Sequence, residues 1–166
     1  MSPGSRKLLL TVHVSSSVGW LGAVAAFNAL ALTGLSSLDI GRVRAVSVAM
    51  EVIAWWVILP ACMASLISGV VQSLGTPWGL VRHHWTFAKL SITVVSTAML
   101  LVHMRPIQLL GGLASNAALG TGDLRDVRTQ LAVASGLAEL ALLVATVLSV
   151  YKPKGLTWYG RRAQVE

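Results

Sequence analysis

Five ionisable side chains stand inside long apolar stretches of this sequence, where a charge is costly. They are His13, Glu51, Lys89, His103 and Glu139. An imidazole can bind a metal or carry a proton, an amine can bind a metal or pair with a carboxylate, and a carboxylate can take up a proton or a cation. In hydrocarbon each of these groups costs several kcal/mol unless it is paired or hydrated, so each is a candidate for a functional site.

These residues belong to four stretches that are apolar enough to cross a membrane. Hydrophobic residues make up 55% of the 166 positions, charged residues make up 11%, and the mean hydropathy is +0.73. A bilayer core of about 30 Å needs roughly 20 apolar residues per helix, and the runs are too long and continuous for barrel strands. The sequence therefore predicts an all-α polytopic membrane protein, a four-transmembrane-helix bundle that forms one domain over residues 1–166. Its spans are predicted at residues 8–35, 46–73, 85–104 and 129–151.

The basic residues between and beyond the spans are divided unequally between the two sides of the membrane. One side has Arg6, Lys7, Arg82, Lys152, Lys154, Arg161 and Arg162, and the other has Arg42, Arg44, Arg105, Arg125 and Arg128. Because cytoplasmic loops are enriched in Lys and Arg, this division predicts cytoplasmic termini and a multi-pass protein of the plasma (inner) membrane. The tail after residue 151, rich in basic and aromatic residues, is typical of an anchor at the headgroups.

The net charge of +7 does not indicate nucleic-acid binding, because the cations are spread over short loops and a tail rather than gathered on one face. The partners expected for such a chain are the lipid bilayer, and a second copy or another membrane protein.

Two further patterns predict how the helices pack. Small residues recur at every fourth position of the second span, which favours close approach of helix backbones, and Pro60 predicts a kink in the same span. The small residues are Ala61, Ser65, Gly69 and Ser73. The glycine-rich segment 105–128, with Gly111 and Gly112, is expected to lie along the outer interface, in part as a short helix.

Depth in the membrane can be predicted from position, because each helical residue rises 1.5 Å and successive spans run in opposite directions. His13 and Lys89 then lie at a similar depth near the cytoplasmic end. Glu51 and His103 lie near the opposite surface. Glu139 lies near the middle, with no cation evidently beside it. The third span carries Lys89 and His103 on one stripe that is expected to face the bundle interior.

The order and spacing of several residues resemble those of a known membrane superfamily. They are His13 with Trp20 and Gly22 beyond it, Pro60 with Gly69, and Trp85, Lys89, Leu90 and His103 on the third span. This pattern resembles the four-helix superfamily of HemJ-type protoporphyrinogen oxidases, CopD-type copper-resistance proteins and related integral membrane proteins. The resemblance covers the first three spans.

The resemblance implies a bundle that binds heme b or a porphyrin, with His13 as the metal ligand, Lys89 as its partner and Trp20 at the same site. The sequence departs from the HemJ pattern ahead of the second span, where Met50 and Glu51 stand in place of arginines. It also has five methionines but no cluster of Met or Cys that would suit copper.

Three functions remain open from the sequence. The first is a redox or porphyrin-handling protein that uses His13 and Lys89, with the reaction, if any, unspecified. The second is a transporter or accessory subunit in which Glu51, His103 and Glu139 form a proton or ion path. The third is a structural or partner-binding bundle whose polar residues only fix the register of the helices.

Overall fold

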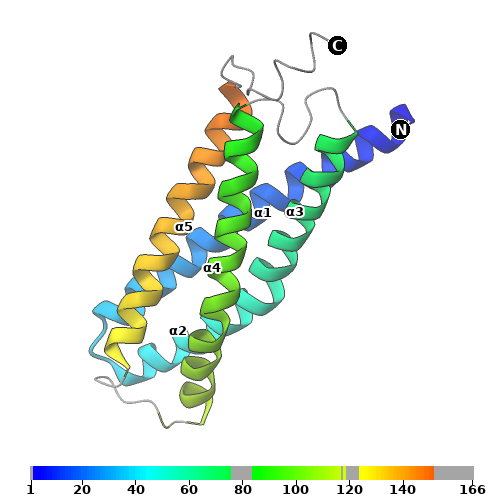
Figure 1. Ribbon diagram of the computed structural model, residues 1–166. Coiled ribbons are helices and arrows are strands. Elements are labelled where there is room, and N and C mark those ends of the chain that lie inside the picture. Colours follow the sequence, from blue (N-terminus) through cyan, green and yellow to red (C-terminus); the bar gives the residue numbers. More distant parts are fainter. Residues whose placement is uncertain (1, 76–83, 117, 119–123, 152–166) are drawn as a thin grey trace.

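The chain forms four long helices, as the sequence predicts. The computed structural model describes residues 2–75, 84–116, 118 and 124–151. Four helical segments are long and apolar enough to cross a membrane: Pro3–Ser36, Ile40–Leu74, His84–Ser115 and Arg125–Tyr151. In order, the elements are α1 (Pro3–Ser36), α2 (Ile40–Ile53), the π-helical turn η1 (Ala54–Ile58), α3 (Leu59–Leu74), α4 (His84–Ser115) and α5 (Arg125–Tyr151), where α2, η1 and α3 make one span (Figure 1).

Polar residues cap the helices where their starts can be recognised in the sequence. The hydroxyl of Ser2 accepts a hydrogen bond from the backbone N–H of Ser5, and Pro3 occupies the first turn of α1. The carboxylate of Asp39 accepts from the backbone N–H of Gly41 at 2.9 Å and so begins α2. These contacts satisfy N–H groups that have no partner within the helix.

The irregularity predicted at Pro60 takes the form of a π-helical turn just before it. Proline has no backbone N–H, so it cannot bond the carbonyl four residues earlier. The backbone N–H of Leu59 instead reaches Ala54, five residues back, and closes the wider turn. Figure 1 shows the chain changing direction between α2 and α3. The turn therefore sets how α3 is presented to α1 and α4.

The predicted end of the third span at residue 104 is wrong. α4 does not end there but continues through Pro106 to Ser115, so Gly111 and Gly112 belong to the third span rather than to a separate short helix. Neighbouring helices in a bilayer shield such residues, and the backbone has no water to bond instead. The predicted tail after residue 151, and Arg82, lie outside the described residues.

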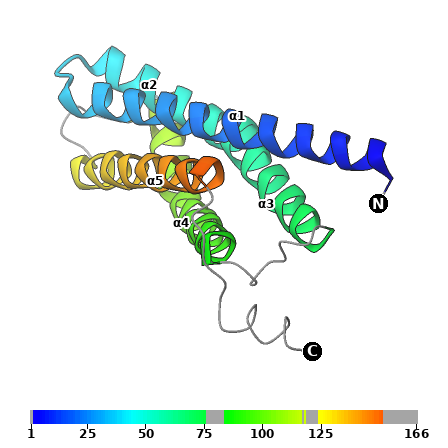
Figure 2. The same ribbon diagram turned by 90° about the horizontal axis from the view of Figure 1, so that it is seen from above.

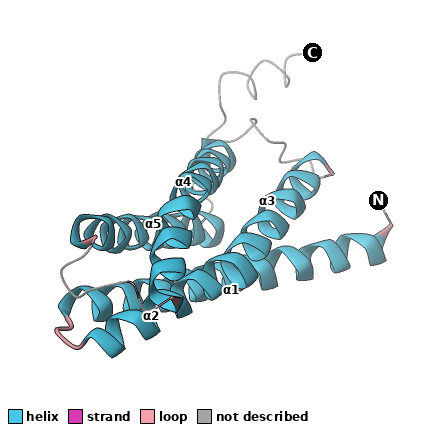
Figure 3. Cartoon of the chain, turned by 90° about the horizontal axis from the view of Figure 1, so that it is seen from below, coloured by secondary structure: helices cyan, strands magenta, loops and turns pink. Residues whose placement is uncertain are grey.

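The bundle is organised around α1, which packs against α2, α3 and α5, while α4 packs mainly against α2 and α5. Seen from above, α3, α4 and α5 lie on one side of α1, with α3 diverging from α5 (Figure 2), and the view from below shows α2 continuing into α3 (Figure 3). Trp20, Phe27, Met50, Ile107 and Leu131 belong to the shared core. Many outward-facing side chains are also large and apolar, among them Val18, Leu32, Trp56, Val102 and Leu137. An apolar exterior suits a multi-pass membrane protein, because lipid replaces water there.

Candidate functional site

His13 and Lys89 meet between α1 and α4. Nζ of Lys89 lies 3.5 Å from Nε2 of His13, and both side chains are half-buried. The two residues are 76 positions apart in the chain, so only the packing of the spans brings them together. Their predicted common depth is consistent with this contact.

The other ring nitrogen of His13 is held by α3. Nδ1 lies 3.1 Å from the backbone carbonyl of Ser65 and 3.1 Å from the hydroxyl of Ser68. A carbonyl can only accept, so Nδ1 carries the hydrogen and donates it, which leaves Nε2 with a lone pair. This second contact fixes the tautomer and orientation of the imidazole, as is usual for histidines that bind metals.

Gly69 lets the imidazole approach α3. A Cβ atom at this position would lie 3.0 Å from Cε1 and 3.4 Å from Nδ1 of His13. Ser65 and Gly69 belong to the small-residue series predicted to be a packing seam. The side chain that packs against this seam is the imidazole of His13 from α1.

We expect Gly69→Val to displace the imidazole from Ser65, because the larger side chain occupies the space of the ring. Nitrogen-15 NMR of histidine-labelled protein in bilayers should show His13 protonated at Nδ1 in the natural protein and a changed tautomer signal in the variant. Gly22→Val is the matched control, since a Cβ atom at Gly22 meets nothing within 4 Å. An unchanged His13 signal in Gly69→Val would contradict the arrangement.

A cleft of about 400 Å³ opens beside the pair, at the end of the bundle where α1 begins and α3 ends. Side chains of α1, α3, α4 and the last turns of α5 line it. Apolar walls come from Leu10, Val14, Leu66 and Leu90, and polar lining includes Arg6, Gln72, Thr86 and Lys89. The volume lies within the range of about 300–1,000 Å³ that is typical of small-molecule sites.

Thr86 is a polar residue of this cleft that the sequence did not single out. Its side chain is buried, and its hydroxyl has no hydrogen-bond partner within the described chain. Such a hydroxyl is costly to bury unless something bonds it. Ser65 was predicted only as part of the packing seam, and Ser68 was not singled out, because the sequence does not show which side chain of a neighbouring helix lies against the seam.

The other predicted site residues lie elsewhere. Trp20 is buried and lines a second cavity, deeper in the bundle, with His103. Glu139 accepts a hydrogen bond of 3.0 Å from the side-chain amide of Asn28. Its partner inside the membrane is therefore a neutral amide rather than a cation. Glu51 lies against Gly111 of α4. Gly111 is eight residues beyond His103 on α4. Glu51, which lies beside Gly111, is therefore about 12 Å from His103 along the axis of α4.

No group of three or more His, Cys, Asp or Glu side chains that could hold a metal ion occurs in the part of the chain the structure describes. Comparison of the chain with protein-family models, curated proteins and solved structures found no match. The functional assignment therefore depends on the geometry of the cleft and on the spacing of its residues.

Proposed function

We propose that the cleft beside His13 and Lys89 binds a tetrapyrrole, either heme b or an iron-free porphyrin, and that the protein serves redox chemistry or porphyrin handling in the plasma (inner) membrane. The observation that carries the proposal is the pair itself: the Nε2 lone pair of His13, with Nδ1 anchored on α3, faces an amine 3.5 Å away at the edge of a cleft of about 400 Å³.

The residues present fit the chemistry of a tetrapyrrole. An imidazole whose Nδ1–H is bonded to a carbonyl is a common axial ligand of heme iron through its other nitrogen. Leu10, Val14 and Leu66 provide apolar surface for a flat ring, and Arg6 lines the same cleft and provides a cation for an acidic substituent. A bound heme would supply one-electron chemistry at its iron, while the chain binds and orients it and limits the access of water.

Lys89 has a defined part in this proposal. Its amine donates to Nε2 of His13 in the structure, which provides a partner for both groups inside the membrane. With a heme or porphyrin in the cleft, Lys89 would either bind the iron together with His13 or pair with a propionate carboxylate. Lys89 lines the cleft, as both roles require.

The test is an absorption spectrum of the full chain, purified in detergent after expression with ample heme, before and after reduction with dithionite. We expect a Soret band that sharpens and shifts on reduction. A parallel titration with protoporphyrin, followed by fluorescence, separates a heme protein from a porphyrin binder. Colourless protein that also leaves protoporphyrin fluorescence unchanged would contradict the proposal.

A further inference from the structure

Glu139 is a carboxyl group at the middle of the last span, and no cation of the described chain pairs with it. Along the axis of α5 it lies about 21 Å from Arg125 and about 18 Å from Tyr151. Its side chain is half-buried and bonds the side-chain amide of Asn28 on α1. A carboxylate at this depth costs several kcal/mol when no cation balances it. Binding of a proton removes the charge and with it that cost.

The charged and titratable side chains of α5 and of the two helices packed against it lie at other depths. They are Arg6, Lys7 and His13 on α1, His84, Lys89, His103 and Arg105 on α4, and Arg125, Asp126, Arg128 and Tyr151 on α5. The nearest in depth is His103, whose ring contacts Gln130, nine residues or about 14 Å before Glu139. None of these groups is therefore placed to neutralise Glu139 by direct contact.

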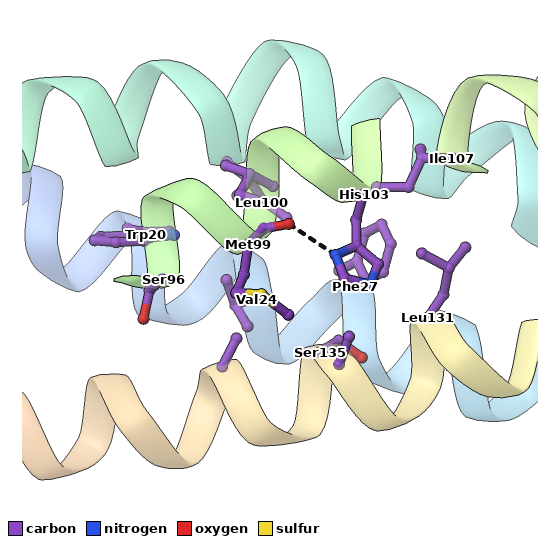
Figure 4. A pocket seen from close by; sticks show the side chains of 13 residues that line it. Trp20, Val24, Phe27, Ser96, Met99, Leu100, His103, Ile107, Leu131 and Ser135 are labelled. Atoms are coloured by element: carbon purple, nitrogen blue, oxygen red, sulfur yellow. Dashed lines mark hydrogen bonds between the residues drawn. The ribbon is translucent and has the colours of Figure 1, made fainter. Parts of the chain in front are cut away.

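In the structure, Asn28 is oriented for the charged form of Glu139. Its Nδ2 donates to Oε2 of Glu139 at 3.0 Å, and its Oδ1 accepts from the hydroxyl of Ser135, also at 3.0 Å. Ser135 is buried and lines the apolar cavity of Trp20 and His103, where Figure 4 shows it on the α5 side. The three polar side chains thus form one chain of hydrogen bonds between α5 and α1.

The same side chains can also hold the neutral form of Glu139 with their heavy atoms in place. A half-turn of the Asn28 amide exchanges its oxygen and nitrogen, which are nearly equal in size. The protonated carboxyl of Glu139 then donates to Oδ1 of Asn28, and Nδ2 donates to the oxygen of Ser135. The hydroxyl of Ser135 in turn donates to the backbone carbonyl of Ala132, which lies 3.0 Å away. The added proton, the amide and the hydroxyl each have an acceptor in this second pattern.

We propose that Glu139 is a proton-binding site inside the membrane, and that the amide of Asn28 turns over when the proton binds or leaves. The proton bonds to a carboxylate oxygen and cancels its charge, and no other covalent bond changes. A divalent metal ion would need more oxygen ligands than Glu139, Asn28 and Ser135 supply. The site does not depend on the tetrapyrrole proposed for the cleft, because none of its three residues lines that cleft.

The test is a pH titration of the full chain in bilayers, followed by solid-state NMR with labelled glutamate and asparagine. We expect the Cδ signal of Glu139 to move between the positions of a neutral carboxyl and a carboxylate, and the side-chain signals of Asn28 to change at the same pH. Asn116, the other asparagine of the chain, is the internal control, because its amide donates to the carbonyl of Gly112. A Glu139 signal that stays in one position while the bundle remains folded, or Asn28 signals that do not follow it, would overturn the proposal.

Two further measurements sharpen the result. Glu139→Gln removes the titrating group but keeps its size, and is expected to abolish the pH response of Asn28. Glu51→Gln is the matched control, since Glu51 also lies within a span but against Gly111 of α4, and it should leave the response unchanged. A response that persists in Glu139→Gln counts against the site. Replacing choline chloride with sodium chloride at constant pH should leave the Glu139 and Asn28 signals in place, whereas a saturable change would assign the site to a metal cation and overturn the assignment to a proton.

Discussion

His13→Ala is expected to abolish the Soret band of protein expressed with ample heme. The alanine removes the Nε2 lone pair that faces the cleft, and no other histidine in the described chain lines that cleft. Loss of a residue that only orients a metal ligand costs about 10–100-fold in affinity, so loss of the ligand itself should cost roughly 100-fold or more. Heme content per polypeptide, measured from the absorption spectrum of the purified variant, tests this.

The control for His13→Ala is His84→Ala. His84 lies at the exposed start of α4 and does not line the cleft, so its loss removes an imidazole without touching the proposed site. The control should keep the natural spectrum, as should His103→Ala, which alters only the deeper cavity. If His13→Ala binds heme as the natural protein does, His13 is not the ligand.

The similar depth of His13 and Lys89 could be calculated from the sequence, whereas their pairing was implied only by the family resemblance. A membrane helix has little choice of length, and adjacent spans are antiparallel, so the depth of a residue can be calculated from its distance to the end of an apolar run. The direction in which each side chain points was harder to predict from the sequence. His13 bonds Ser65 and Ser68 of α3, whose rotation follows the π-helical turn before Pro60. Pro60 predicts a kink at this point, but the sequence gives neither its form nor its direction.

For Trp20, the spacing along the sequence predicted the face of the helix but not the site to which the side chain belongs. It stands seven residues after His13, which is nearly two full turns and places both side chains on one face of α1. The same two turns carry Trp20 about 10 Å deeper, and it lines the cavity of His103 rather than the cleft. The sequence could therefore predict that His13 and Trp20 share a face of α1. Whether they share a site depends on the positions of the other helices.

The end of the third span was mispredicted because the glycines after residue 104 were interpreted as they would be in a soluble protein. In a soluble protein, Gly111 and Gly112 beside Pro106 would indicate a loop. In a bilayer the backbone has no solvent to bond, so the helix persists, and a glycine instead marks a close approach of another helix. The neighbour of Gly111 is Glu51 of α2, whose carboxylate lies over the glycine.

Gly111→Ala is accordingly expected to destabilise the bundle. The new Cβ would overlap a carboxylate oxygen of Glu51 and would lie 2.7 Å from its Cδ and 2.8 Å from its Cβ. Because part of the clash is with Cβ, rotation of the glutamate side chain cannot relieve it, and α2 and α4 must separate. Overpacking of this kind costs about 1–3 kcal/mol in free energy of unfolding, which thermal or denaturant unfolding of the purified protein can measure.

Gly112→Ala is the matched control for that measurement. It lies one residue further along the same helix, where an added Cβ meets nothing within 4 Å, so the higher helix propensity of alanine should leave stability unchanged or raise it by up to about 1 kcal/mol. In the double variant Gly111→Ala with Glu51→Ala, the carboxylate and Cδ are gone and part of the loss should be recovered. Equal stability of Gly111→Ala and Gly112→Ala would show that α2 and α4 do not meet closely at Glu51.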